Sequence, residues 1–172
     1  MILVHTALLC EAQSFIEYFK LKKIHSTPKI YANDTILICV SGVKAKNTIA
    51  SLEYVYENFT ISKAFNIGIA GCNNHNIKIG NLYCTNQRLK DINTLPLVTA
   101  DTVVTSSNAL ATLLYDMEGE VFEQVSQKYL NEKDIIIFKV VSDHLSAEIL
   151  KKDYIKLLLS KQKIILDFIK LD

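Results

Sequence analysis

The chain has 172 residues, of which 19 are Lys or Arg and 18 are Asp or Glu, so its formal net charge is only +1. A chain that is 49% hydrophobic, with 5 Gly and 2 Pro, is typical of one compact domain over residues 1–172 and excludes a disordered or collagen-like protein. Because nucleic-acid and membrane-surface binders need a concentrated positive face, we expect no nucleic-acid partner and no membrane partner.

The N-terminal segment and the cysteines predict the cellular location. Residues 1–13 start apolar without a basic stretch and reach Glu11 too early for a membrane span, so they predict a buried strand. The four cysteines are scattered singly, three of them in apolar runs, which is typical of a reducing cytosol. We therefore expect a cytoplasmic protein. Neither the cysteines nor the four histidines show metal-ligand spacing, and we expect no metal and no other cofactor.

The first half of the chain alternates strand-length apolar runs with helical patterns. In residues 11–19, Phe15 and Phe19 are four apart, which predicts a helix with one apolar stripe. Residues 46–59 predict a second helix, whose apolar face is formed by Ile49, Leu52, Val55 and Tyr56. Continuous apolar runs predict three buried strands, at residues 1–9, 35–40 and 64–70.

The second half continues this alternation, which is the signature of an α/β domain. The run DIIIFKVVS at residues 134–142 is the most strongly β-branched and predicts a central strand. Residues 147–172 carry apolar side chains at helical spacing and predict one long helix with at most one break. Between these we expect a strand at 79–86, a polar loop at 87–95, β-structure at 97–104 and 113–116, and a helix at 118–130.

Acidic residues and glycine turns follow the predicted strands. Because ligands bind beyond the carboxyl ends of strands in open α/β sheets, we expect Glu11, Glu118 and Asp143 to converge on one rim. Each also has a purely structural interpretation. Glu11 and Glu118 suit a helix N-terminus through the helix dipole, and the pair Ser142-Asp143 is typical of a helix N-cap.

Five segments stand out together: ALLCEA at 7–12, SGV at 41–43, NIGIAG at 66–71 followed by IKIGNLYC, DMEGEVFEQV at 116–125, and FKVVSD at 138–143. In order and strand context they resemble the motifs of the purine nucleoside phosphorylase and nucleosidase superfamily. The resemblance covers most of the chain. It is greatest to the methylthioadenosine/S-adenosylhomocysteine nucleosidase branch, in a shortened form. It implies an α/β fold, a three-layer α/β/α sandwich with a central mixed β-sheet, and a homodimer.

The resemblance also implies roles for the matched positions. Asp143 would hydrogen-bond purine N7 and protonate it, while Ser142 orients the base. Glu118 would bind the ribose 2′- and 3′-hydroxyls, with Met117 packed against the sugar, and Glu11 would hold and activate water. The other positions implied to contact the substrate are Ser41, Gly42, Ala70, Gly71 and Val103.

The implied function is a purine nucleoside N-ribosyl hydrolase for an adenosine-type nucleoside such as 5′-methylthioadenosine, S-adenosylhomocysteine or aminodeoxyfutalosine. Arg suits a phosphate site best, yet 18 of the 19 basic residues are Lys and the one Arg is Arg88. Glu11 would repel a phosphate dianion and suits a water nucleophile. Two alternatives stay open: a phosphorylase that binds phosphate through Lys44, Lys46 or Lys139 and backbone N–H groups, and a non-catalytic nucleoside-binding relative.

Overall fold

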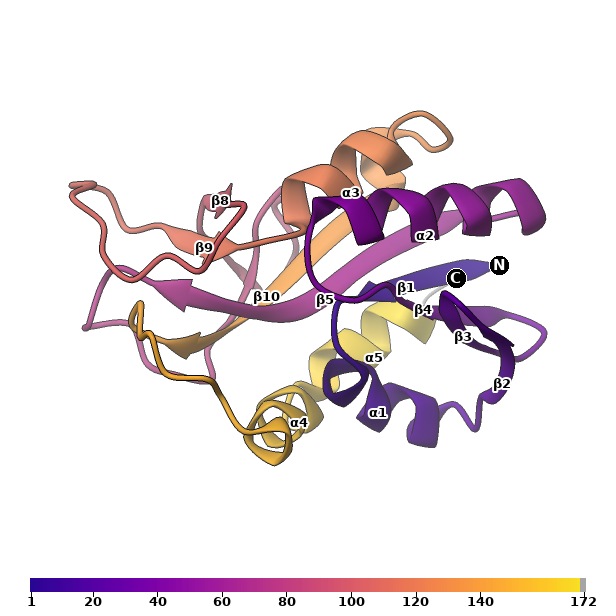
Figure 1. Cartoon of the computed structure of the whole chain (residues 1–172), viewed down its shortest axis with the longest axis horizontal. Helices are drawn as coiled ribbons and strands as arrows, with labels where there is room; N and C mark the ends of the chain where they lie inside the picture. The colour runs from indigo at the N-terminus through magenta and orange to yellow at the C-terminus, as the bar shows by residue number, and fades with distance from the viewer. Residues whose placement is uncertain (171–172) are drawn as a thin grey trace.

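The protein is built in three layers, with one mixed β-sheet between two layers of helices (Figure 1). The computed structural model describes residues 1–170. The main path of the sheet is β2-β3-β4-β1-β5-β10-β6-β7, and β9 pairs with β5 and with β8. The predicted three-layer α/β/α sandwich with a central mixed sheet is therefore confirmed. The strands are β1 (Ile2–Thr6), β2 (Lys22–Ser26), β3 (Lys29–Ala32), β4 (Ile36–Val40), β5 (Lys63–Cys72), β6 (Leu82–Cys84), β7 (Asn93–Thr94), β8 (Leu97–Thr99), β9 (Leu114–Asp116) and β10 (Ile135–Asp143).

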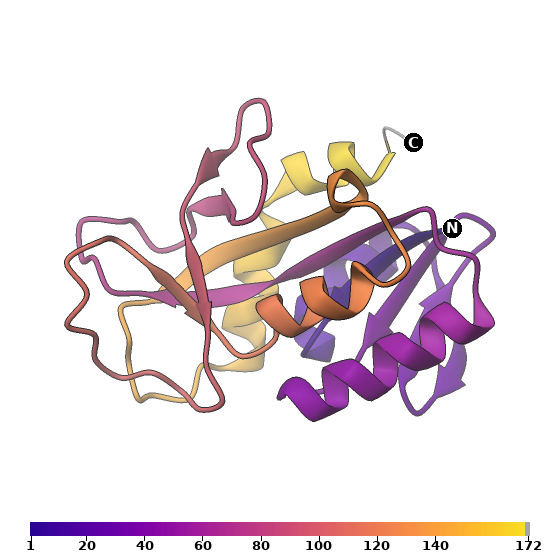
Figure 2. The same ribbon diagram turned by 90° about the horizontal axis from the view of Figure 1, so that it is seen from above.

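Helices cover both faces of this sheet. Two of them lie side by side on one face, and three cover the other (Figures 1 and 2). The first pair is α2 (Ala45–Asn58) and α3 (Gly119–Ser126), and the second group is α1 (Leu9–Tyr18), α4 (Lys152–Ser160) and α5 (Lys163–Lys170). Among residues 1–170, no helix has the length and apolar character needed to cross a membrane.

The centre of the sheet is parallel and apolar on both faces, as expected for strands covered by helices on each side. β1 pairs in parallel with β4 and β5, and β5 pairs in parallel with β10. The prediction of a central strand at residues 134–142 is confirmed, since β10 lies between β5 and β6. Successive residues enter two different cores: Leu3 packs with α2 and α3, while Val4 packs with α1, α4 and α5.

The predicted boundary between the first strand and the first helix is wrong by about one turn. β1 ends at Thr6, and α1 begins at Leu9, so the last residues of the apolar run start the helix. Glu11 is the third residue of α1, and its carboxylate accepts hydrogen bonds from the backbone N–H groups of Ala7 (3.1 Å) and Leu8 (2.8 Å). This cap fixes the start of the helix, which apolar periodicity alone cannot locate in a short run.

The helix predicted over residues 147–172, with at most one break, starts later than predicted and is broken once, into two helices. Residues 144–151 are irregular, and α4 begins only at Lys152. Leu145 follows β10 with a φ of 57°, in the left-handed region that ends regular structure. α5 then runs from Lys163 to Lys170, while residues 171–172 of the predicted helix lie outside the described part of the chain.

The edge hairpin of β2 and β3 is absent from the sequence predictions. Its lysine-rich strands bury only Ile30 and Ala32, which leaves too weak an apolar pattern to identify. In α2, Ile49 is exposed rather than buried, because Thr48 and Ser51 lie on the sheet side. The other predicted elements are present: β5 is longer than the predicted strand at 64–70, α2 matches the length of the helix predicted at 46–59, and the rest are shorter, while β7 lies inside the segment expected to be loop.

Candidate functional site

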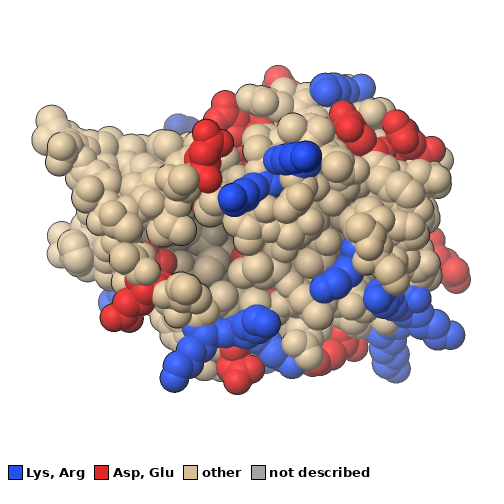
Figure 3. All heavy atoms as spheres, viewed as in Figure 1, with Lys and Arg blue, Asp and Glu red and all other residues tan. Residues whose placement is uncertain are grey.

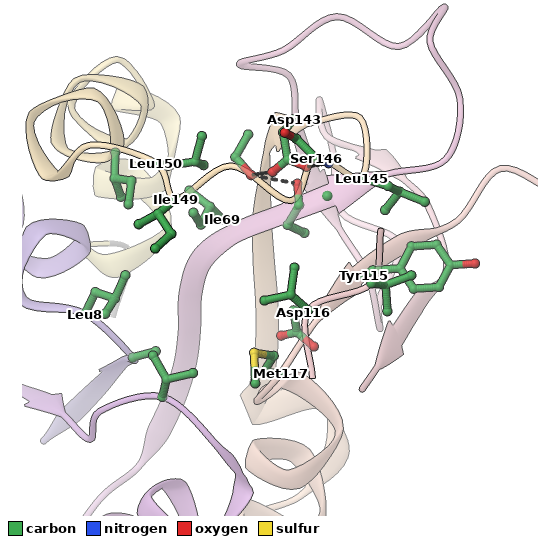
Figure 4. A pocket seen from close by; sticks show the side chains of 18 of the residues that line it. Leu8, Ile69, Tyr115, Asp116, Met117, Asp143, Leu145, Ser146, Ile149 and Leu150 are labelled. Carbon is green, nitrogen blue, oxygen red and sulfur yellow. Dashed lines mark hydrogen bonds between the residues drawn. The ribbon is translucent and has the colours of Figure 1, made fainter. Parts of the chain in front are cut away.

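A cavity of about 350 Å³ opens at the carboxyl ends of the parallel strands. Ligand pockets in proteins commonly have volumes of roughly 300–1,000 Å³, so it has room for a small molecule. Figure 3 shows the surface hollowed on this face, in the half of the molecule away from both termini. Side chains from β5, β9, β10 and the loops around them enter the cavity (Figure 4).

Most of the residues implicated by the sequence meet in this cavity. Those that line it are Glu11, Ala70, Gly71, Val103, Met117, Glu118, Ser142 and Asp143. The structure places Ser41 and Gly42 outside the lining, where the backbone turns after β4, and their neighbour Val43 lines the cavity instead.

The irregular segment after β10 supplies a wall that the sequence analysis missed. Leu145, Ser146, Ile149 and Leu150 all line the cavity (Figure 4). The helical spacing of Ile149 and Leu150 was the one signal in this segment, and it pointed to a helix. Other lining residues not singled out from the sequence are Leu8, Ile69, Tyr115 and Ile155.

Glu11 is a deeply buried carboxylate of this cavity, with 3% of its surface exposed. One oxygen, Oε2, accepts the two N–H groups at the start of α1, and the other, Oε1, accepts the N–H group of Ile69 at 3.1 Å. Burial raises the pKa of Glu11 to about 7, and the backbone donors and the nearby ammonium group of Lys139 limit that rise. The side chain is therefore fixed in place and able to gain or lose a proton near neutral pH.

Two glycines of the NIGIAG segment let the acids approach the sheet closely. A Cβ atom on Gly68 would lie 2.9 Å from Glu11 Oε1 and 3.4 Å from Lys139 Nζ. A Cβ atom on Gly71 would lie 3.3 Å from an oxygen of Asp143. A side chain at Gly68 would therefore displace Glu11, which explains why this strand carries glycine there.

Beneath the cavity, Lys139 and Asp116 form a buried ion pair. Lys139 Nζ lies 2.7 Å from Asp116 Oδ2, and the two side chains are only 3% and 2% exposed. Asp116 also accepts hydrogen bonds from the Gly119 N–H group at 2.8 Å and the Thr99 hydroxyl at 2.6 Å. With these donors the carboxylate is fully paired, which a buried charge requires.

Glu118 is the N-cap residue of α3, rather than an acid within its first turn. Its Oε1 atom accepts a hydrogen bond from the backbone N–H group of Lys44 at 2.9 Å. This bond links the segment after β9 to the start of α2. Burial raises the pKa of Glu118, while the Lys44 N–H group and the Lys139 ammonium group act in the opposite direction. Glu118 lines the cavity, so its carboxylate can also accept hydrogen bonds from a ligand.

Asp143 ends β10 at the cavity rim. Its Oδ2 atom accepts the hydroxyl of Ser142 at 2.6 Å, and its Oδ1 atom accepts the N–H group of Ser146 at 2.9 Å. The N-cap interpretation of Ser142-Asp143 is wrong, because the N-cap residue of α4 is Lys151. The two hydrogen bonds instead hold the carboxyl group in a fixed orientation at the cavity (Figure 4).

The charge of the lining is entirely negative. The Asp, Glu, Lys, Arg and His residues that line it are all acidic: Glu11, Asp116, Glu118, Asp143 and Glu148. No Lys, Arg or His lines the cavity, and Arg88 lies elsewhere, in the segment between β6 and β7. Within residues 1–170, no cluster of three or more His, Cys, Asp or Glu side chains is arranged to hold a metal ion.

No protein-family model and no curated protein matches the sequence. Solved structures do match. A 5′-methylthioadenosine/S-adenosylhomocysteine nucleosidase from S. pneumoniae, with the transition-state inhibitor MT-ImmA, matches with a TM-score of 0.82 at 15% identity, over 99% of this chain and 99% of that chain. The futalosine hydrolase of Helicobacter pylori matches with a TM-score of 0.80 at 14% identity, over 98% and 96%. The adenine-bound MTAN of Chlamydia trachomatis matches with a TM-score of 0.79 at 17% identity, over 99% and 97%. At these identities the likeness shows the fold, which is that of the nucleosidases.

Proposed function

We propose that the protein is a purine nucleoside N-ribosyl hydrolase. The observation that carries the proposal is the meeting of Glu11, Glu118 and Asp143 in one cavity whose charged lining is wholly acidic. Cleavage of an N-glycosidic bond leaves a positive, oxocarbenium-like sugar and a negative base. Carboxyl groups placed around the bond supply both the proton that the base needs and the negative charge that the sugar needs.

Asp143 is the proposed general acid. It protonates purine N7, which makes the base a better leaving group, and a positioned acid of this kind contributes a factor of ~10²–10⁴ in rate. The hydroxyl of Ser142 and the N–H group of Ser146 keep the carboxyl group aimed into the cavity. Their contacts support this role because proton transfer depends first on orientation.

Glu118 is the proposed ribose-binding residue. Lys44 holds one of its oxygens, and the carboxylate lines the cavity, where it can accept the 2′- and 3′-hydroxyls. Hydrogen bonds to a carboxylate are worth about 1.5–3 kcal/mol each. The negative charge also stabilises the cation that develops on the sugar.

Glu11 is the proposed base that activates water. A pKa of about 7 gives it a useful fraction of ionised carboxylate at neutral pH together with enough basicity to accept a proton. Because three backbone N–H groups fix the carboxylate, a water molecule bound to it is directed toward the sugar.

The cavity favours water over phosphate as the nucleophile. Lys139 is already paired with Asp116, and the N–H group of Lys44 is already donated to Glu118. Arg88 does not reach the lining. A phosphate dianion would therefore meet carboxylates without a compensating cation, which is a costly arrangement.

The proposed substrate is an adenosine-type nucleoside, such as 5′-methylthioadenosine, S-adenosylhomocysteine or aminodeoxyfutalosine. The names of the structural neighbours support this class. We further propose a cytoplasmic homodimer. Support comes from exposed apolar side chains near the cavity, where Val103 is 65% exposed and Ile149 is 98% exposed, because such side chains commonly mark an interface.

The test is base release by purified protein from a panel of purine nucleosides, with Asp143→Asn beside it. Asparagine keeps the shape but cannot donate the proton, so the rate falls by ~10²–10⁴-fold. The matched control is Asp153→Asn, which makes the same change on the exposed surface of α4 and leaves the rate unchanged. Undiminished cleavage by Asp143→Asn contradicts the assignment of the acid, and no cleavage of any nucleoside by the unaltered protein contradicts the function.

A further inference from the structure

A buried histidine lies below the cavity and takes no part in the proposed reaction. His5 is in the middle of β1 and is fully buried. Its Nε2 atom lies 2.9 Å from Ser41 Oγ, and its Nδ1 atom lies 2.7 Å from Asn66 Nδ2. The ring stacks on Phe122 of α3, with 5.5 Å between the ring centroids. None of these four residues lines the cavity.

The partners of the imidazole define where its proton lies. With the Asn66 amide placed as it is, its Nδ2 group donates to His5 Nδ1, which assigns the ring proton to Nε2. That proton is donated to Ser41 Oγ, whose own proton is donated to the Gly42 carbonyl oxygen at 2.8 Å. Burial, assisted by the charge of Lys139, lowers the pKa of His5 to about 3, so the ring is neutral at physiological pH.

This chain of hydrogen bonds ends at the backbone that holds Glu118. Ser41 and Gly42 lead into Lys44, whose N–H group is bonded to Glu118. Gly42 and Lys44 have φ values of 85° and 89°, which for Lys44 is an unfavourable conformation that needs support from its surroundings. The His5–Ser41 hydrogen bond ties this turn to the rigid centre of the sheet.

His5 also contacts the second element that positions Glu118. The side chain of Phe122, on which the imidazole stacks, belongs to the first turn of α3, and its N–H group donates to the Glu118 carbonyl oxygen at 2.8 Å. One imidazole ring therefore supports Glu118 from both sides. It fixes the turn that binds the carboxylate, and it packs against the helix whose N-cap is Glu118.

We propose that His5 is a positioning residue for Glu118, acting through the Ser41–Lys44 turn and through Phe122. The inference rests on the proposed function, in which Glu118 binds the ribose hydroxyls. Its consequence is selective: loss of His5 weakens recognition of the hydroxyls that Glu118 binds and leaves the rest of the substrate contacts intact.

The test compares kcat/KM for a purine ribonucleoside and for its 2′-deoxy counterpart. In His5→Leu, the preference for the ribonucleoside falls by about tenfold, as expected when one or two hydrogen bonds to Glu118 lose their alignment. His25→Leu is the matched control, because His25 also stacks on an aromatic ring, Tyr54, and bonds a backbone oxygen, but on the distant edge hairpin. This control leaves the preference unchanged.

A second variant guards against failure of His5→Leu to fold. Ser41→Ala removes the hydrogen-bond acceptor with little change in volume, and the preference falls by about threefold. In the unaltered protein, the nitrogen NMR spectrum of His5 shows a protonated Nε2 and an unprotonated Nδ1 at neutral pH.

The outcomes separate this inference from the proposed function. The positioning role alone is overturned if the unaltered enzyme prefers the ribonucleoside and the variants lose activity equally on both substrates. A ring proton on Nδ1 overturns it as well. An unaltered protein that cleaves neither substrate, or cleaves both equally, overturns the ribose role of Glu118 on which the inference depends.

Discussion

The cavity is bounded by two walls of different construction, one at the ends of the strands and one made of loops. In the strand-end wall, formed by Glu11, Asp116, Glu118 and Asp143, every carboxylate accepts at least one hydrogen bond or ion pair from the protein. The loop wall, residues 102–104 and 145–150, is irregular and exposes apolar side chains such as Val103 and Ile149. Placing these four carboxylates at the ends of strands and the starts of helices keeps their geometry fixed, whereas the loops can vary without disturbing it.

The largest expected loss of activity comes from a substitution in the strand-end wall. Glu118→Ala removes the proposed contacts to the ribose hydroxyls, and kcat/KM falls by ~10²–10⁴-fold, as expected for two hydrogen bonds to a carboxylate. Glu120→Ala is the control, since Glu120 lies two residues further along, in the first turn of α3, and is exposed. Steady-state kinetics on one nucleoside checks both, and a loss below about threefold in Glu118→Ala contradicts the assigned role.

The next effect concerns stability. Lys139→Met leaves Asp116 as an unpaired buried charge, and the free energy of unfolding falls by about 3–5 kcal/mol. Lys156→Met breaks a pair with Glu17 in which both side chains are partly exposed, at 34% and 56%, and costs about 0–1 kcal/mol. Urea denaturation measures the two losses in the free energy of unfolding. Equal losses would contradict the prediction that the buried Lys139–Asp116 pair contributes more to stability than the partly exposed Lys156–Glu17 pair.

A smaller effect is expected from pH. Because burial raises the pKa of Glu11 from 4.5 to about 7, its base form accumulates only as the pH rises through about 7. The value of kcat/KM therefore rises with pH around that point. The free energy of unfolding follows the opposite trend, decreasing from pH 4.5 to about 7, because the folded state binds the Glu11 proton more tightly than the unfolded state.

The pH dependence has an internal control. Glu11→Gln cannot titrate at this position, so any remaining activity no longer shows the rise near pH 7. Persistence of the same rise in that variant would assign it to another group.

The smallest effect is expected in the loop wall. Ile149 is 98% exposed, and Ile149→Ala changes the free energy of unfolding by less than about 0.5 kcal/mol. The same substitution at Ile137 of β10, where the side chain is 2% exposed, costs about 2–5 kcal/mol. Thermal or chemical denaturation of both variants shows whether the loop wall is as dispensable to the fold as its exposure implies.

The difference between the strand-end wall and the loop wall also explains what could be predicted from the sequence. The central strands are continuous apolar runs, so the residues just after strands could be identified as candidates for the site, and the family resemblance gave them roles. Glu11, Glu118 and Asp143 were predicted in this way, and the structure brings them into one cavity. The buried partner of Asp116 was not predicted, because ion pairs across strands leave no periodic signal.

The loop wall could not be predicted for a physical reason. Ile149 and Leu150 have the spacing of a helix face, but the left-handed conformation at Leu145 and the contacts of Asp143 with Ser146 hold the backbone in a loop. These are tertiary constraints that local spacing does not encode. The absence of Ser41 and Gly42 from the cavity lining has a similar origin, since Ser41 turns toward buried His5.

The measurement that most directly tests the central claim is the identity of the sugar product. Purified protein is incubated with 5′-methylthioadenosine, with and without inorganic phosphate, and the base and sugar are analysed. We predict adenine release at the same rate in both cases, with a free sugar as the second product. Cleavage that requires phosphate and yields a sugar phosphate would contradict the claim that the acidic strand-end wall activates water.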